Sequence, residues 1–455
     1  MKSKLALLSF MLMFVFVVTA CSGGKNNSSP SESPSASKPA ESAASETPTS
    51  SSSTPPELKE AKITFLNTKG EIQTQLEEAV KVFNQDYPAI TVEILAVPAG
   101  SSPFERASQL YAAGNPATIL MLDPSDVSKF KDRILDLSGE KWVPDAIENS
   151  LTKEDGKVLD FPFAVEGFAY IYNKKVLDAA VSGSFDPATI KTRSDLKNLF
   201  AQIEASGKKA IHVSPMDWSL AAHFLNFMYA DQSKDYAQVE KFITDLKAGN
   251  ANLAGNTVFN GLIDTFDLMK EHNNAKDKPL TPVYETGPEA LAKGEVGLWF
   301  MGNWAWPNIK GFDASGEYGF LPVPISDNAD DYGNTQIATA VTKRLVLDKE
   351  NATTDQQAAA KKFLEWLVYE QNGQDFLVNK ANIIPAFNSI TLEPQDPLAK
   401  SIKSYMAKGA MVVGMTTLPA DHWSKVGASM QKYLAGASDR TALAKAIEAY
   451  WKSAK

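Results

Sequence analysis

The 455-residue sequence holds a single cysteine, Cys21, so no disulfide can form within the chain. Histidine is almost as scarce. The four histidines, His212, His223, His272 and His422, lie far apart, and none stands in a His-Glu-x-x-His or comparable spacing for metal ligands. The sequence therefore predicts neither a disulfide framework nor a metal site.

The signatures of several common enzymes are missing as well. The chain has no Gly-x-Ser-x-Gly elbow, no Walker loop and no Gly-x-Gly-x-x-Gly turn, which argues against the usual hydrolases, NTPases and dinucleotide-binding enzymes. We expect no cofactor and no catalysis. A glycosidase needs only two carboxylates and leaves no readable motif, so a carbohydrate-active enzyme remains an alternative.

Acidic residues outnumber basic ones, with 54 Asp and Glu against 45 Lys and Arg. The formal net charge is -9, and neither a basic stripe nor an aromatic run typical of RNA-binding domains is present. A nucleic-acid partner is therefore not expected.

The longest apolar run, residues 5–18, follows Lys2 and Lys4 and is shorter than the roughly 20 residues that a spanning helix needs. It ends in Val-Thr-Ala before Cys21, which is typical of a signal peptide with a lipoprotein-type cleavage site. We expect residues 1–20 to be removed and Cys21 to carry lipid, such as palmitate chains, at the outer face of a bacterial cell membrane. An uncleaved signal anchor is the alternative.

Residues 22–56 contain no Val, Ile, Leu or aromatic residue and consist mostly of Ser, Pro, Ala, Thr and Glu. Such a stretch cannot bury enough apolar surface to offset the entropy of ordering. With Cys21, residues 21–56 are therefore predicted to form a lipidated, disordered linker. The remaining 400 or so residues have an ordinary globular composition and suffice for about two lobes.

The folded part begins with a strand-helix-strand-helix-strand pattern over residues 63–122. The last strand, residues 118–122, is apolar enough to be buried on both faces. Ligands of such parallel sheets bind beyond the carboxyl ends of the strands, here near residues 67–70 and 123–126. Helical spacing then dominates, with further strands expected at residues 296–301, 319–323 and 335–341; the predicted helices are 194–206, 218–229, 236–248, 262–271, 356–369 and 441–452.

Several segments occur in the order typical of a known family: 67–70 (NTKG), 161–174 (FPFAVEGFAYIYNK), 302–309 (GNWAWPNI) with 318–324 (YGFLPVP), and 359–367 with 383–387 (IIPAF). With these motifs, essentially everything after residue 60 resembles the family 1 extracellular solute-binding proteins.

The resemblance implies an α/β fold of the two-lobe periplasmic-binding-protein type, a Venus flytrap with mixed sheets covered by helices and a ligand cleft between the lobes. One lobe would take residues 57–165 plus about 334–385, and the other 166–333 plus about 386–455. The implied function is that of a monomeric substrate-binding lipoprotein of an ABC importer, which captures a sugar or oligosaccharide and passes it to the membrane permease. Rival classes are a carbohydrate-active enzyme and a surface adhesin or sensor.

Sugar sites combine flat aromatic platforms with planar hydrogen-bonding groups. The motif match makes Trp304 the stacking residue, whereas Trp306 is expected to pack inside its lobe. Trp423 and Trp218 are further candidate platforms. Trp218 opens a predicted helix after Asp217, which could instead be a helix cap.

The predicted hydrogen-bonding residues come from the same matches and from the strand ends. Glu166 matches a cleft carboxylate and Lys69 a loop residue that contacts the sugar; the alternative for both is a solvated surface position. Asn303 stands beside Trp304 in the motif. The remaining candidates lie at strand ends: Asn67, Asp123 and Asp126. An aromatic platform that the family can carry near Asp123 is missing, which argues against maltodextrin as the ligand.

Overall fold

The computed structural model describes residues 59–97, 102–147, 150–415, 418–419 and 421–454. The predicted signal peptide (1–20), Cys21 and the predicted linker (21–56) lie outside these ranges. Within them, no helix is both long enough and apolar enough to cross a membrane.

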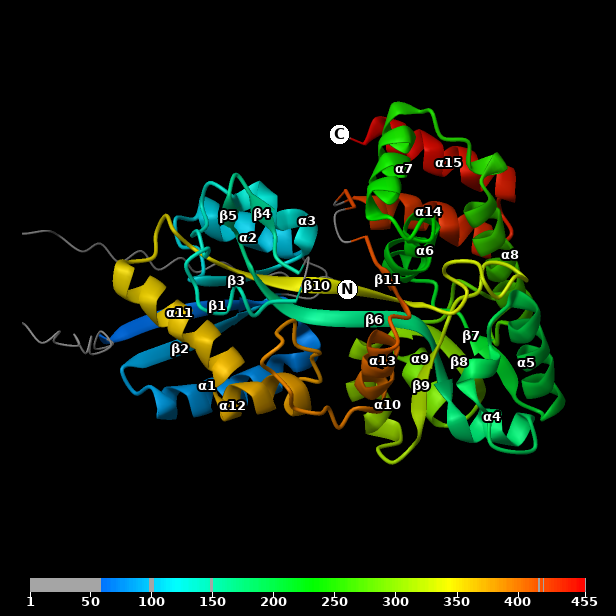
Figure 1. Cartoon of the computed structure of the whole chain (residues 1–455), viewed down its shortest axis with the longest axis horizontal. Coiled ribbons are helices and arrows are strands. Elements are labelled where there is room, and N and C mark those ends of the chain that lie inside the picture. The colour runs from blue at the N-terminus through cyan, green and yellow to red at the C-terminus, as the bar shows by residue number, and fades with distance from the viewer. Residues whose placement is uncertain (1–58, 98–101, 148–149, 416–417, 420, 455) are drawn as a thin grey trace, which may run out of the picture. The chain divides into compact units, whose positions relative to one another are not determined.

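Nine strands of the described part form one mixed sheet in the order β2-β1-β3-β10-β6-β8-β7, with β9 paired to β6 and β11 to β10 (Figure 1). These strands are β1 (Ala61–Asn67), β2 (Ile90–Ala96), β3 (Ile119–Leu122), β6 (Phe161–Asn173), β7 (Lys209–His212), β8 (Val296–Gly302), β9 (Tyr318–Leu321), β10 (Ile337–Leu347) and β11 (Met411–Val413). A separate hairpin pairs β4 (Lys153–Glu154) with β5 (Lys157–Val158).

Helices connect and cover these strands. They are α1 (Gln73–Asp86), α2 (Pro103–Ala112), α3 (Pro124–Val127), α4 (Lys174–Ala180), α5 (Arg193–Ala205), α6 (Asn226–Ala230), α7 (Tyr236–Ala248), α8 (Thr257–His272), α9 (Thr286–Ala292), α10 (Trp306–Phe312), α11 (Thr354–Tyr369), α12 (Gln371–Asp375), α13 (Pro397–Ala407), α14 (His422–Leu434) and α15 (Arg440–Ser453).

The pattern predicted for residues 63–122 is confirmed. β1 pairs in parallel with β2 on one side and with β3 on the other, and α1 and α2 make the connections. A capping box starts α2: the Ser102 hydroxyl accepts from the Glu105 N–H, and the Glu105 carboxylate accepts from the Ser102 N–H. A local sequence signal therefore fixes the beginning of this helix.

Side chains of β3 enter two different hydrophobic clusters, because successive residues of a strand point to opposite faces of the sheet. Ile119 and Met121 pack with α1 and α11, whereas Leu120 and Leu122 pack with α2. All four side chains are fully buried. The prediction of a strand buried on both faces is therefore confirmed.

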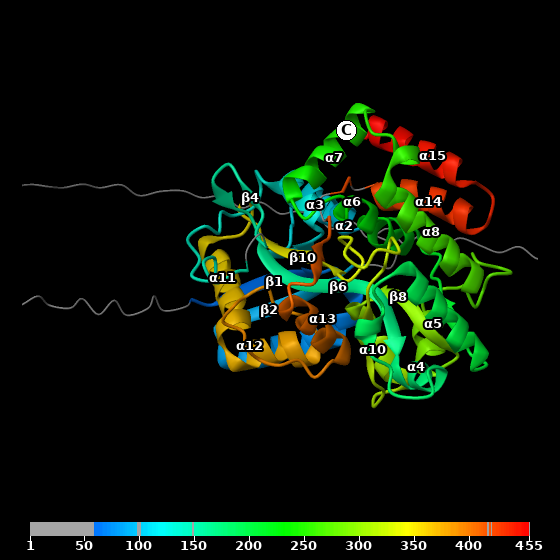
Figure 2. The same ribbon diagram turned by 45° about the vertical axis from the view of Figure 1, so that its right-hand side comes forward.

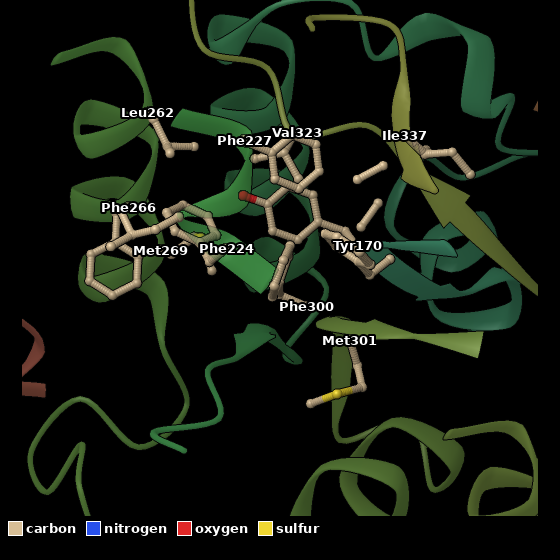
Figure 3. Packing of buried hydrophobic residues seen from close by; sticks show 14 of the residues in the cluster. Tyr170, Phe224, Phe227, Leu262, Phe266, Met269, Phe300, Met301, Val323 and Ile337 are labelled. Atoms are coloured by element: carbon tan, nitrogen blue, oxygen red, sulfur yellow. The ribbon is translucent and has the colours of Figure 1, made fainter. Parts of the chain in front are cut away.

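The second half of the chain builds a third hydrophobic cluster around β6, β8 and β9. Figure 3 shows part of it, where the ring of Phe300 meets Tyr170 edge-on at 5.9 Å and Phe224 at 5.3 Å. The helix predicted for residues 218–229 is not continuous. Its first part, Ser219–Phe224, is a π-helix, and α6 begins at Asn226.

β6 and β10 are the longest strands of the described part and run between two groups of elements (Figures 1 and 2). β10 pairs antiparallel with both β3 and β6, and β6 continues to β8 and β9. Leu345 and Leu347 of β10 lie in the cluster of α1 and α11, whereas Ile337 and Ala338 lie in the third cluster. One strand therefore contributes to two cores.

Candidate functional site

Three charged side chains meet just beyond the end of β1. Lys69 Nζ lies 2.6 Å from Glu166 Oε1 and 2.7 Å from Glu71 Oε1, and we call these residues the charged trio. Lys69 and Glu166 are only 4% and 8% exposed. The Asn67 side chain holds the loop, because it accepts from the Lys69 N–H at 2.9 Å and donates to the Lys69 carbonyl at 3.0 Å. Asn67 thus shapes the loop that presents Lys69.

Mutual attraction keeps Lys69 and Glu71 charged. Burial by itself would lower the pKa of Lys69, but the carboxylates of Glu166 and Glu71 outweigh burial and raise this pKa above its ordinary value. Burial would likewise raise the pKa of Glu71, and the Lys69 ammonium outweighs it, so the pKa of Glu71 is lowered. An ammonium donor and carboxylate acceptors are therefore available side by side at neutral pH.

A β-bulge in β10 directs two adjacent side chains toward carboxylates. The register of β10 against β6 shifts around Thr342 and Lys343. Bulges of this kind often re-aim side chains beside functional sites. The Thr342 hydroxyl donates to Glu166 Oε2, and Lys343 forms an ion pair with Asp123. The bulge thus fixes one carboxylate of the charged trio and one of the acids that follow β3.

Asp123 and Asp126 follow β3, and each is engaged by a lysine. Asp123 pairs with Lys343, and Asp126 Oδ1 lies 2.7 Å from Lys129 Nζ. Asp126 is 3% exposed, and burial raises its pKa. Both acids therefore already have a cationic partner.

Trp304 lies in the turn Asn303–Ala305, directly after β8. Its ring covers Gly302: a Cβ atom at that position would stand 2.0 Å from Trp304 Cζ3. The centre of the ring is 4.7 Å from that of His223 and 6.5 Å from that of Phe168. The position of the indole is thus set from two sides.

Asn303 and Trp306, which flank Trp304 in the motif, are buried and make contacts within the protein. Asn303 is 1% exposed, and its side-chain oxygen accepts from the Gly167 N–H at 3.0 Å, which ties the turn to β6. Trp306 is 5% exposed and packs against Tyr318 with ring centres 5.8 Å apart. The expected core position of Trp306 is therefore confirmed.

Trp218 extends the group of rings around Trp304. Its ring centre lies 5.5 Å from His223 and 6.1 Å from Tyr284. Burial and, after it, the Glu71 carboxylate raise the pKa of the Tyr284 hydroxyl, which places this phenol near the charged trio. We call Tyr284, Trp218, His223 and Trp304 the aromatic wall.

Trp423 stands apart from the aromatic wall. It is 41% exposed at the first turn of α14, and it has no ring-to-ring contact with another described residue. Its neighbour His422 is buried instead, with Nε2 2.7 Å from the Tyr229 hydroxyl. In this conformation the structure does not bring Trp423 together with the other predicted platforms.

A small cavity lies between the charged trio and Trp304 of the aromatic wall. Four of the predicted residues line it together: Lys69, Glu166, Asn303 and Trp304. The other lining residues are Glu71, Ile72, Pro307, Ala381, Asn382 and Ile383. We take this cavity as the candidate site because donors, acceptors and an aromatic ring converge on it.

A larger groove of about 830 Å³ is lined by residues of α13 and β9 and by Trp306, and it contains none of the predicted ligand residues. Its size alone would make this groove the candidate ligand site, but the predicted aromatic and charged side chains line the smaller cavity instead. Across the described ranges, no group of three or more His, Cys, Asp and Glu side chains is arranged to hold a metal ion.

Sequence reasoning missed four residues of this region: Glu71, Thr342, Tyr284 and His223. Glu71 lies two positions after Lys69, so the strand-end argument that selected Asn67 could have reached it. Thr342 reaches Glu166 through the β-bulge in β10, which the sequence pattern does not predict. Tyr284 and His223 are placed by the packing of distant segments, for which the sequence carries no local signal.

Solved structures share this fold. RafE in complex with raffinose superposes with a TM-score of 0.71 at 17% identity, covering 86% of this chain and 99% of that one. The apo form of RafE from Streptococcus pneumoniae gives 0.69 at 16% identity, covering 88% and 99%. A sugar transporter from Bacillus licheniformis in complex with stachyose gives 0.64 at 15% identity, covering 86% and 99%. The fold is therefore that of the two-lobe solute-binding proteins.

A family model agrees with the fold. The model described as bacterial extracellular solute-binding protein matches residues 78–407, which is well over half of the chain. The protein belongs to this family.

Proposed function

We propose that the protein captures a sugar or oligosaccharide in a cleft between two lobes and delivers it to the permease of an ABC importer, without chemistry on the ligand. The observation that carries the proposal is a cavity lined by the charged trio and Trp304, with the other rings of the aromatic wall linked to Trp304 through ring contacts. A pyranose ring offers a flat C–H face to an aromatic ring and a rim of hydroxyl groups to charged and amide groups.

The proposal gives each side chain a role. Trp304 and Trp218 stack on sugar rings, and Lys69, Glu166 and Asn303 bind hydroxyl groups. Asp123 and Trp423 would contact a longer ligand at the margin of the cleft, the buried Asp126 would reach such a ligand only by leaving its pair with Lys129, and Asn67 shapes the Lys69 loop. RafE with raffinose and the Bacillus licheniformis transporter with stachyose support an oligosaccharide as the ligand.

The proposed lobes are residues 57–165 with about 334–385, and residues 166–333 with about 386–455. Separate hydrophobic clusters support two lobes, and the strands β6 and β10 contribute side chains to both clusters. A ligand that contacts both lobes makes interactions that only the closed form satisfies, so binding shifts the population toward closure. The closed form would be the signal that the permease recognises.

A thermal-shift screen over mono- and oligosaccharides tests the ligand class. A ligand at 100 times its Kd should add about 2.7 kcal/mol of stability. If no carbohydrate raises the melting temperature but peptides or polyamines do, the proposal that the ligand is a sugar is refuted. Formation of a product would indicate an enzyme instead. Binding without closure, measured by small-angle scattering, would favour an adhesin or sensor.

Export and anchoring are part of the proposal. The apolar run of residues 5–18 and Val-Thr-Ala before Cys21 support cleavage and lipidation at that residue. Mass spectrometry of the cell-associated protein should show a lipidated Cys21 as the first residue. A mature chain that retains Lys2, or a Cys21→Ala protein that stays equally membrane-bound, would contradict this.

A further inference from the structure

A π-helical turn lies against Trp304, one of the residues that line the candidate site. Within Ser219–Phe224, the Leu225 N–H bonds to the Leu220 carbonyl at 3.1 Å, five residues back instead of four. Turns of this kind are rare and are frequently found at functional sites. The Asn226 side chain, bonded at 3.0 Å to the Ala222 carbonyl, supports the turn where the ordinary helical pattern is interrupted.

The π-turn presents His223 to the aromatic wall. The centre of the imidazole lies 4.7 Å from the Trp304 ring, 5.5 Å from Trp218 and 4.9 Å from Phe168. A second contact fixes the turn: the Asn226 side chain donates to the Met415 carbonyl at 2.9 Å and accepts from the Met415 N–H at 2.8 Å. The imidazole is therefore held against the predicted sugar platform.

The imidazole of His223 has unused hydrogen-bonding capacity. Neither ring nitrogen bonds to another described residue, and Nδ1 is buried with no partner among those residues. Burial lowers the pKa of His223 to about 3, so the ring is neutral at neutral pH. A neutral imidazole offers one donor and one acceptor. Since buried polar groups are nearly always paired, an unpaired one in a binding site calls for a partner.

We propose that His223 is a specificity-determining residue of the cleft, whose imidazole hydrogen-bonds a hydroxyl group of the sugar ring that stacks on Trp304. This inference rests on the proposed function. A sugar hydroxyl both donates and accepts, so it matches a neutral imidazole, and small shifts of the Trp304 ring on binding give it access. A residue that only supports the platform would need no nitrogen, because a phenylalanine ring fills nearly the same space.

The test compares His223→Phe, which keeps an aromatic ring, with His223→Asn and His223→Gln, which keep a donor and an acceptor. Raffinose, stachyose and maltose are titrated by calorimetry into each folded variant, and urea unfolding is measured in parallel. We expect His223→Phe to bind about tenfold more weakly with undiminished stability, and Asn or Gln to recover part of the loss. His272→Phe is the matched control, because His272 bonds to Glu204 outside the candidate site and should not affect affinity.

Affinity of His223→Phe equal to that of the wild type would overturn the proposal, since the imidazole would then serve packing alone. If His223→Phe does not fold, His223→Leu against His223→Asn makes the same comparison. If none of the three sugars binds to the wild type, the proposed function fails for these ligands and the inference falls with it. Binding by the wild type with no difference among the variants removes only the inference.

Discussion

Trp304→Ala removes the ring that covers Gly302 and lies beside His223, and we expect a large fall in ligand affinity with only a modest loss of stability. A stacked ring at the centre of a site contributes on the order of 1.5–3 kcal/mol, which is roughly a 10- to 150-fold rise in Kd. Trp304 is only partly buried. Its removal should therefore lower the free energy of unfolding by about 1–2 kcal/mol, less than the roughly 3–5 kcal/mol of a fully buried tryptophan.

Trp306 is the matched control two positions along the chain. It is 5% exposed and packs in the core against Tyr318. Trp306→Ala should lower the free energy of unfolding by about 3–5 kcal/mol and leave the affinity of the folded protein near that of the wild type.

The assay pairs titration calorimetry, with the sugar that the thermal-shift screen identifies, with urea unfolding of both variants. The reasoning is refuted if Trp304→Ala binds normally but loses as much stability as Trp306→Ala. That result would assign Trp304 to the core and leave the charged trio without its platform.

Three more substitutions test particular contacts. Gly302→Ala should reproduce most of the affinity loss of the Trp304 variant, because its Cβ would stand 2.0 Å from that ring; an unchanged titration would show that the ring can move freely. Asp231 is buried, and neither carboxylate oxygen has a hydrogen-bond partner among the described residues, so burial raises its pKa well above 3.8. A raised pKa in the folded state means that stability is lost as the pH rises above the ordinary pKa of about 4. The stability gained by Asp231→Asn should therefore grow as the pH is raised from about 4 toward neutral, and a gain that does not change with pH would contradict this. Arg344→Met leaves the carboxylate of Asp160 buried without its cation, and urea unfolding should show a loss of about 3–5 kcal/mol; a loss below about 1 kcal/mol would mean that the pair acts like an exposed one.

Local periodicity was sufficient to predict the first strands and helices. An uninterrupted apolar run between turn residues predicts that both faces of β3 are buried, as they are. The start of α2 is likewise marked in the sequence by its capping box. Two features escape such reasoning because they depend on distant partners. The bulge at Thr342 exists only when β10 lies against β6, and the π-turn Ser219–Phe224 gives way to α6 at Asn226, whose side chain contacts Met415.

Part of the candidate site could be predicted from the sequence. Lys69, Glu166 and Trp304 line one cavity, because a strand-end loop, a crossing strand and a conformationally restricted turn meet there. Trp423 does not join them in this conformation, since its neighbour His422 faces the core and the indole stays exposed. Which of two adjacent side chains of a helix turns inward depends on how that helix docks, and a pattern of residues does not contain this information.

The pairing of β3 with β10 has a consequence for how the protein acquires its structure. Asp123 and Lys343, which meet at this pairing, are 220 positions apart, and α11, which covers one face of the same strands, comes later still. Contacts over such a distance form slowly, because the entropy of closing the intervening loop is lost before the contacts compensate it. A chain that emerges from its N-terminus therefore holds three apolar strands without their neighbour until most of its length has appeared, and it needs protection from aggregation during that interval.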